Sequence, residues 1–261
     1  MDIIVCVKRV PDTSEAEVLI ARDGRHIEEK GLVFDINEWD RYAVEEAVLL
    51  KEKLGGTVTA ITLGPEGSED TLRRCLATGA DSAIRLADPA LAGSDAVATA
   101  RALCQAIKGR KFDLVLTGAQ AGDDASAQVG PVLAGLLGVP HATLVNSMEI
   151  TGNKAKVHRE LEGGLEEVVE VQFPALFTIQ TGINEPRYVS IMGIRKAAKQ
   201  EIQRMGLAAL GLKESEVGEA GSWVRVDKLF PPPATKQTEI LSGSLEEVTT
   251  KLAGIIQDKG A

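Results

Sequence analysis

A run of small and polar residues between Thr117 and Pro131 is the part of the sequence best suited to contact an anionic ligand. It follows a predicted strand and precedes a predicted helix, so it would lie at the carboxyl edge of a sheet, where open α/β folds bind ligands. Its glycines and alanines would let a phosphate approach backbone N–H groups, and Ser126 and Gln128 carry side-chain donors. A strand-to-helix loop that only packs closely is the alternative interpretation.

Two acidic residues, Asp123 and Asp124, complicate a phosphate site in this loop. Because an unpaired carboxylate beside a phosphate is repulsive, we assign them to helix capping or turn formation. Three other segments should border the same crevice and offer contacts to an adenosine group. These are Cys6 to Arg9 after the first predicted strand, Asn37 to Asp40 at a helix start, and Leu63-Gly64-Pro65 after the second strand. Their structural interpretations are, in the same order, a small core residue, a helix N-cap at Asn37, and a turn.

The sequence lacks the short motifs of the common nucleotide-binding and hydrolytic enzymes. It has no Gly-x-Gly-x-x-Gly after the first strand, no P-loop, no His-Glu-x-x-His and no Gly-x-Ser-x-Gly. The cysteines, Cys6, Cys75 and Cys104, are far apart, which argues against a disulfide framework, a zinc site or an iron–sulfur cluster and indicates a reducing compartment. We therefore expect neither a metal site nor a self-contained enzyme.

Length and charge restrict the classes of partner. The 261 residues suit one large α/β domain with appendages, and a net charge of −9 disfavours nucleic acid. The longest uncharged stretch, residues 125–145, is broken by glycines and prolines, so no membrane insertion is expected. At the start, the basic residues Lys8 and Arg9 follow the apolar run, which is the wrong order for a secretory signal and indicates a first strand.

Up to about Leu144, apolar runs alternate with helical patterns, which is typical of a mostly parallel sheet covered on both faces. The predicted strands are residues 3–7, 58–63, 83–86, 114–117 and 142–150. The predicted helices are residues 38–54, 69–77, 95–107 and 126–137. A polar excursion over residues 12–31 contains a predicted hairpin turn at Arg22-Asp23-Gly24.

The pattern changes after residue 150. The elements predicted there are an antiparallel hairpin (154–161 and 165–173), a strand (175–181), a basic helix (194–203), an extended stretch (206–243) and a last helix with a capping box at Ser244 to Glu247. We therefore divide the chain into an α/β domain, residues 1–205, and an extended C-terminal arm, residues 206–261. Such an arm is costly to order alone, so we expect it to lie on its own domain or on a partner chain.

Several of these segments together resemble one known family. The matching segments are Val5 to Asp12, Asn37, Ala43 to Ala47, Gly64-Pro65, Ala77 to Asp81, Gln120 to Pro131, Arg159 to Glu166, Pro174-Ala175 and Asn184 to Tyr188. The chain resembles, over essentially its whole length, the β subunit of electron-transfer flavoproteins and FixA. The resemblance implies a mostly parallel, doubly wound α/β sheet of the adenine nucleotide alpha hydrolase-like type, with an added antiparallel hairpin and an extended C-terminal arm.

The resemblance also implies a function. This chain would be an electron carrier subunit in the cytoplasm, paired with an α subunit that holds most of the FAD. The heterodimer would shuttle electrons between acyl-CoA-type dehydrogenases and a membrane quinone-linked oxidoreductase. The β subunit would bind AMP, and the cofactor-binding residues so implied are Cys6, Asn37, Glu38, Trp39, Asp40, Leu63, Gly64, Gly118, Ala119, Gln120, Ala121, Asp123, Asp124, Ala125, Ser126, Ala127, Gln128 and Val129.

Residues 188–199 resemble the family's dehydrogenase recognition loop. Ile191 stands at the position of its apolar anchor, and Arg195 lies among basic residues that would steer an acidic partner. Glu160 is expected to pair with a basic residue of the dehydrogenase. An ordinary core contact at a helix start is the alternative interpretation of Ile191.

The loop residues allow more than one ligand for the β subunit. Family members that bind AMP often have Asn and Thr where this chain has Ala127 and Val129. The sequence of this chain from Ala127 to Pro131 instead resembles the branch that binds a second FAD and bifurcates electrons. That branch, however, tends to have an acidic residue in place of Ala125. A stand-alone adenine-nucleotide-binding module, with the arm folded on its own core, is a third possibility.

Overall fold

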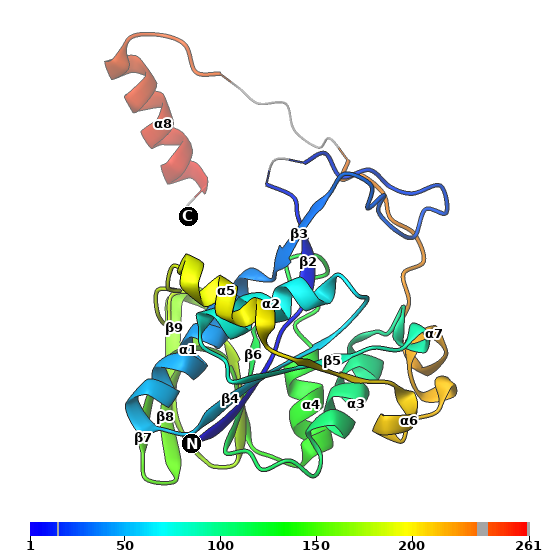
Figure 1. Ribbon diagram of the computed structural model, residues 1–261. Helices are drawn as coiled ribbons and strands as arrows, with labels where there is room; N and C mark the ends of the chain where they lie inside the picture. The colour runs from blue at the N-terminus through cyan, green and yellow to red at the C-terminus, as the bar shows by residue number, and fades with distance from the viewer. Residues whose placement is uncertain (15, 234–239, 260–261) are drawn as a thin grey trace.

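The computed structural model describes residues 1–14, 16–233 and 240–259. Within them the chain is built around a nine-stranded sheet in the order β11-β5-β4-β1-β6-β10-β7-β8-β9 (Figure 1). Its strands are β1 (Asp2–Cys6), β4 (Thr57–Leu63), β5 (Ser82–Leu86), β6 (Leu114–Gly118), β7 (His141–Thr151), β8 (Lys154–Leu161), β9 (Leu165–Gln172), β10 (Ala175–Ile179) and β11 (Ile202–Met205). Neighbours from β11 to β7 are parallel, and β8 and β9 add the antiparallel hairpin. The predicted fold class is confirmed.

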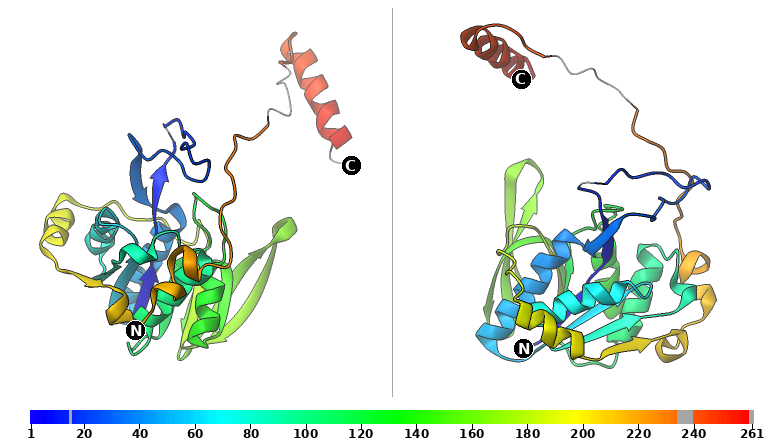
Figure 2. Two further views of the ribbon diagram at one scale, coloured as in Figure 1. Left: turned by 90° about the vertical axis from the view of Figure 1, so that its right-hand side faces the viewer. Right: turned by 45° about the horizontal axis from the view of Figure 1, so that its top comes forward.

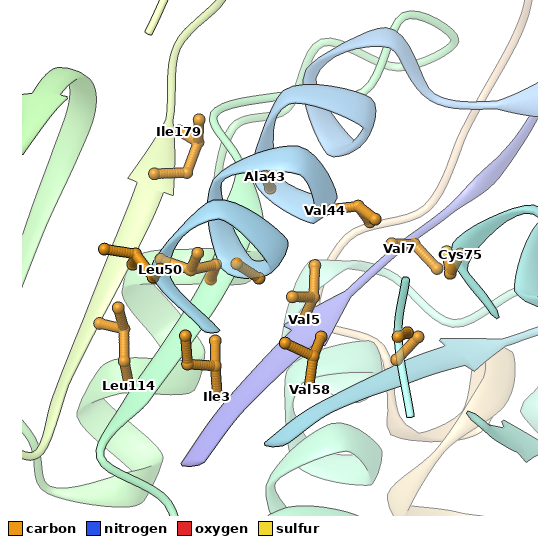
Figure 3. Close-up of a cluster of buried hydrophobic side chains, with 14 of the residues drawn as sticks. Ile3, Val5, Val7, Ala43, Val44, Leu50, Val58, Cys75, Leu114 and Ile179 are labelled. Atoms are coloured by element: carbon orange, nitrogen blue, oxygen red, sulfur yellow. The ribbon is translucent and has the colours of Figure 1, made fainter. Parts of the chain in front are cut away.

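Helices cover both faces of the parallel part of the sheet. One face carries α1 (Glu38–Leu54), α2 (Ser68–Thr78) and α5 (Ile191–Lys199), and the other carries α3 (Ala96–Ile107), α4 (Val129–Leu137) and α6 (Leu207–Leu210). Along β1, Ile3 and Val5 pack under α1 (Figure 3), whereas Ile4 and Cys6 belong to the core cluster of α3 and α4. Because both faces of β1 are buried, the strand is an unbroken apolar run.

A small sheet precedes α1 and was not predicted. Its antiparallel strands are β2 (Arg9–Asp12) and β3 (Val33–Ile36), which enclose the polar excursion. Inside the excursion, Ile20 and Ile27 form a bridge around the expected turn. The remaining short elements are η1 (Pro89–Leu91), η2 (Glu162–Gly164), η3 (Glu214–Glu216) and α7 (Gly218–Gly221).

The predicted helix at residues 126–137 begins later than expected. Ala125 and Ala127 have φ angles of 49° and 54°, which a right-handed helix does not allow, so α4 begins at Val129. The sequence carries no glycine at either position to signal this backbone. The residues before α4 are therefore a loop rather than a first helical turn.

The basic helix predicted at residues 194–203 is shifted towards the N-terminus. α5 begins at Ile191 because the side chain of Ser190 accepts a hydrogen bond from the N–H of Gly193 and caps the helix. Residues after Gln200, predicted to be helical, leave the helix and form β11, which pairs with β5 at the sheet edge.

Part of the predicted arm belongs to the core. Leu207, Leu210, Leu212 and Val217 are buried in the cluster around α3, so the stretch from residue 206 to α7 is packed rather than extended. After α7 most of the described residues are exposed, and the last helix, α8 (Leu245–Lys259), stands away from the α/β domain in Figure 2. The division of folding units at residue 206 stays a prediction.

The capping box of the last helix is confirmed. The backbone N–H of Ser244 donates to Oε2 of Glu247, and the N–H of Glu247 donates to the Ser244 hydroxyl at 3.3 Å. The apolar side chains Leu245, Leu252 and Ile256 are all exposed. No helix in the described part of the chain has both the length and the apolar character needed to cross a membrane.

Candidate functional site

A cavity of about 800 Å³ lies at the carboxyl ends of β1, β4, β5 and β6. In the sheet, β4 and β5 lie on one side of β1 and β6 lies on the other, so the cavity is at a topological switch point. The predicted ligand residues that line it are Cys6, Asn37, Asp40, Leu63, Gly64, Gly118, Ala119, Gln120, Ala121, Asp124, Ser126, Ala127, Gln128 and Val129. The structure thus brings strand ends and the small-residue loop together around one space.

Four predicted ligand residues are not part of the cavity lining: Glu38, Trp39, Asp123 and Ala125. The indole Nε1 of Trp39 donates to Oε1 of Gln180 at 2.8 Å. Asp123 contacts the cavity wall indirectly, through the ammonium group of Lys8. Their assignment as ligand contacts stays a prediction.

Asn37 holds the loop that follows β6. Its side chain is 2% exposed, its Nδ2 donates to the carbonyl of Gln120 at 2.8 Å, and its Oδ1 accepts from the N–H of Gly122 at 3.0 Å. Asn37 is the N-cap residue of α1, as predicted, but its side chain makes no capping bond to the helix. The amide group fits this place because it offers one donor and one acceptor to a loop backbone that needs both.

Asp40 joins the ends of β1 and β6. Its carboxylate accepts from the N–H of Lys8 at 2.6 Å and from the N–H of Gly118 at 3.0 Å. Burial raises the pKa of Asp40 to about 7, although both backbone N–H groups favour the ionised form. A Cβ on Gly118 would lie 2.4 Å from Oδ1 of Asp40, so only glycine allows this close approach.

Lys8 forms ion pairs with both acids of the loop and offsets one of their two negative charges. Its Nζ lies 2.7 Å from Oδ1 of Asp123 and 2.8 Å from Oδ2 of Asp124, while Oδ1 of Asp124 accepts from the N–H of Ser126. The predicted turn-forming role of Asp124 is confirmed, and the lysine partner was missed. Since the carboxylates are paired with a cation, their repulsion of an anion in the cavity is reduced.

The loop leaves backbone donors free beside the cavity. Among the described residues, the N–H groups of Ala127, Gln128 and Val129 have no hydrogen-bond acceptor. These are the N–H groups at the start of α4, where the helix dipole is positive. Free amides and a helix N-terminus together fit a phosphate group, and the ion pairs with Lys8 reduce the repulsion from the two acids, so the residues present are suited to a nucleotide.

The far end of the cavity contains residues that sequence reasoning missed. Arg85 on β5 is 9% exposed, and its Nη1 donates to the carbonyl of Gly64 at 3.2 Å. Its Nε lies 3.0 Å from Oε1 of Glu69, an ion-pair distance, but makes no hydrogen bond with a described residue. Asp88 and Asp95 also line this end. The one sequence signal for this end of the cavity was the presence of Arg85, a charged residue, inside a predicted buried strand.

Cys6 is a wall of the cavity rather than a nucleophile. Burial, with the nearby charge of Asp40, raises the pKa of its thiol to about 12, so the thiolate is scarce at neutral pH. In the described ranges, no group of three or more His, Cys, Asp or Glu side chains is arranged to hold a metal ion.

The predicted docking residues lie on two different elements. Ile191 and Arg195 are exposed on α5, and Ile191 is 69% exposed, which corrects its alternative interpretation as a core contact. Glu160 lies on β8, where its Oε2 accepts from Nε2 of Gln180 at 2.7 Å. Their roles in docking stay predictions.

The sheet order and the place of the cavity put the chain in the class of doubly wound α/β proteins, whose ligands bind at the switch point. Residues 25–210 match the electron transfer flavoprotein domain. The chain is 40% identical over 266 residues to electron transfer flavoprotein subunit beta of Methylophilus methylotrophus, with 100% of both chains covered. It belongs to the electron transfer flavoprotein β-subunit and FixA family, as the resemblance implied.

Other relatives in this family have more specialised names. The caffeyl-CoA reductase-Etf complex subunit CarD of Acetobacterium woodii is 40% identical over 262 residues, covering 99% of both chains. Protein FixA of Azotobacter vinelandii is 37% identical over 250 residues, covering 92% of this chain and 88% of FixA.

Proposed function

We propose that this chain is the β subunit of a heterodimeric electron carrier and that its cavity binds AMP. Family membership over the full length supports the subunit role. The observation that carries the nucleotide proposal is the set of free N–H groups at Ala127, Gln128 and Val129, next to the two acids that are paired with Lys8. In this arrangement the loop amides bind the phosphate and the strand ends hold the adenosine part.

In the proposed heterodimer, an α subunit holds the FAD that carries electrons. When bound, the flavin ring supplies one- and two-electron chemistry, and this chain contributes binding and orientation rather than catalysis. Bound AMP would stabilise the folded subunit, because a ligand that binds only the native state shifts the folding equilibrium. The exposed arm after α7 would grip the α subunit, since its apolar side chains Trp223, Phe230 and Ile256 lack cover in the described chain.

A second FAD in this chain is the alternative ligand. The cavity continues past the loop to Arg85 and Asp95, and its volume of about 800 Å³ lies in the upper part of the usual range for ligand pockets. Ala127 and Val129 also lack the polar side chains that often accompany AMP in the family. With FAD in the cavity, the protein would be an electron-bifurcating component.

Flavin counting separates these two ligands. The heterodimer is purified and denatured, and the released flavin and AMP are quantified against protein. About one flavin with about one AMP per heterodimer supports the proposal, and about two flavins with no AMP supports the second FAD. If the chain purifies as a stable monomer with nucleotide and never with a flavin-bearing subunit, it is a stand-alone nucleotide-binding module and the carrier proposal is wrong.

We further propose that the carrier works in the cytoplasm. There it accepts electrons from acyl-CoA-type dehydrogenases and passes them to a membrane quinone-linked oxidoreductase. The exposed Ile191 would be the apolar anchor of the docking segment, residues 188–199, and Arg195 would steer an acidic partner. Glu160 would pair with a basic residue of the dehydrogenase. The test measures reduction of the heterodimer by a dehydrogenase charged with its acyl-CoA. Ile191→Ala should raise the dehydrogenase's KM for the heterodimer.

A further inference from the structure

The docking segment exposes apolar side chains on a short stretch of backbone. Tyr188, Ile191, Met192 and Ile194 are all exposed, and Ala197 is the buried residue of α5. A helix of nine residues with one buried side chain is not held firmly by its own packing. The position of the apolar side chains therefore depends on what fixes the backbone around them.

The backbone before α5 is fixed by an ion pair with α1. Arg187 donates from Nε to both carboxylate oxygens of Glu45 at 3.0 Å, and its backbone N–H donates to Oε2 of Glu45 at 3.1 Å. The side chain of Glu45 is 3% exposed and that of Arg187 is 33% exposed, so the carboxylate of the pair is buried while the guanidinium group reaches the surface. Glu52, which lies about two turns further along α1 and is largely exposed, binds the outer nitrogens of the same guanidinium group.

The other end of α5 is fixed by α2. Nη1 of Arg73 donates to the carbonyls of Ala197 and Gln200 at the helix C-terminus. A Cβ on Gly193 would lie 3.0 Å from the carbonyl of Ala77, so α5 and the end of α2 are in close contact. The segment is thus held at Arg187 on one side and at Arg73 on the other.

We propose that Glu45 is a positioning residue for partner docking, which acts by clamping Arg187 and so presenting the apolar side chains of residues 188–194 in one fixed arrangement. The inference rests on the proposed docking role of this segment. A segment ordered before binding loses less conformational freedom when the partner arrives, so the clamp favours association without touching the partner. It leaves the electron-transfer step itself unchanged.

The test compares two substitutions on α1 in the purified heterodimer. Glu45→Gln removes the charge of the buried carboxylate, and Glu52→Gln is the matched control, because it removes the exposed carboxylate that binds the same arginine. Hydrogen exchange is measured on peptides that cover residues 188–199. We expect Glu45→Gln to speed exchange there by about tenfold or more, as for loss of a buried charged hydrogen bond. Glu52→Gln should change it by less than about fivefold, as for an exposed pair.

Kinetics supply the second readout. The heterodimers are reduced by a short-chain acyl-CoA dehydrogenase charged with butyryl-CoA, with the dehydrogenase fixed and the heterodimer concentration varied. The proposal predicts that the dehydrogenase's KM for the heterodimer rises about tenfold in Glu45→Gln, with kcat unchanged. Arg187→Lys keeps the charge but loses the forked geometry, so it provides the same test if Glu45→Gln does not fold.

The outcomes separate the clamp from the docking role. Unchanged exchange in residues 188–199 of Glu45→Gln overturns the clamp whatever the kinetics show. Faster exchange with an unchanged KM overturns the docking role of the segment, and with it the positioning role of Glu45. The proposal that the chain is a subunit of the electron carrier is not affected by that result. Faster exchange with a raised KM and the same kcat supports both.

Discussion

Replacing Asp40 with asparagine should make the free energy of unfolding less dependent on pH between about 4 and 7. Burial raises the pKa of this carboxyl from 3.8 to about 7, so between these values the folded protein holds a proton that the unfolded chain has lost. The stabilisation by Asp40 is therefore complete below about pH 4 and is lost as the pH rises through about 7. At about 1.4 kcal/mol per pKa unit, the whole change amounts to about 4 kcal/mol.

Asparagine resembles the neutral carboxyl in shape and in its hydrogen-bonding groups, and it does not titrate. Any fixed cost of its Nδ2 facing the N–H groups of Lys8 and Gly118 is the same at every pH. The difference in unfolding free energy, Asp40→Asn minus wild type, should therefore rise by up to about 4 kcal/mol from pH 4 to pH 8.

The assay is urea unfolding of the purified complex, followed by tryptophan fluorescence at a fixed protein concentration, because partner binding shifts apparent stability. Asp70→Asn is the control, since it removes the same charge from an exposed position on α2, outside the arm. A difference between Asp40→Asn and wild type that stays constant across this pH range would refute the reasoning. It would mean that the two backbone N–H groups stabilise the carboxylate as well as water does.

Two further predictions concern the cavity and the arm. Lys8→Met should weaken AMP binding about tenfold in calorimetry at low salt, with the exposed Lys30→Met as control, because it leaves two carboxylates unpaired beside the phosphate. Equal affinity for AMP would show that the charge of Lys8 is not felt in the cavity. Deleting residues 223–261 should weaken association with the α subunit at least tenfold while leaving the α/β domain folded, because burial in the core ends with α7. Unchanged subunit affinity in analytical ultracentrifugation would contradict this role of the arm.

The fold was largely predictable because its signals are local. The apolar runs of β1 and β4, the helical period of α1 and the paired glycines at the tip of β8 and β9 each indicate one element. Two features that were not predicted depend on distant parts of the chain. β11 adds to the sheet edge next to β5, and the stretch from Leu207 to Val217 packs on α3. A local sequence pattern does not contain the information for such contacts.

The site was predictable in its position but not in its internal contacts. Small residues after a strand indicated the loop, and strand ends indicated the crevice. The pairing of Lys8 with Asp123 and Asp124, across more than a hundred residues, had no sequence signal. The left-handed backbone at Ala127 was missed as well, because alanine rarely adopts it and nothing in the sequence announced it.

The place of β10 in the sheet determines when, during synthesis of the chain, the cavity can be completed. Every residue that lines the cavity is numbered 130 or lower. Yet Ala119 donates its N–H to Ile179, and Gly130 packs tightly against Thr178, both on β10. A ribosome that has translated the first 170 codons has therefore made all of the pocket wall but not the strand that supports it, so the cavity is complete only after β10 is synthesised and inserts between β6 and β7.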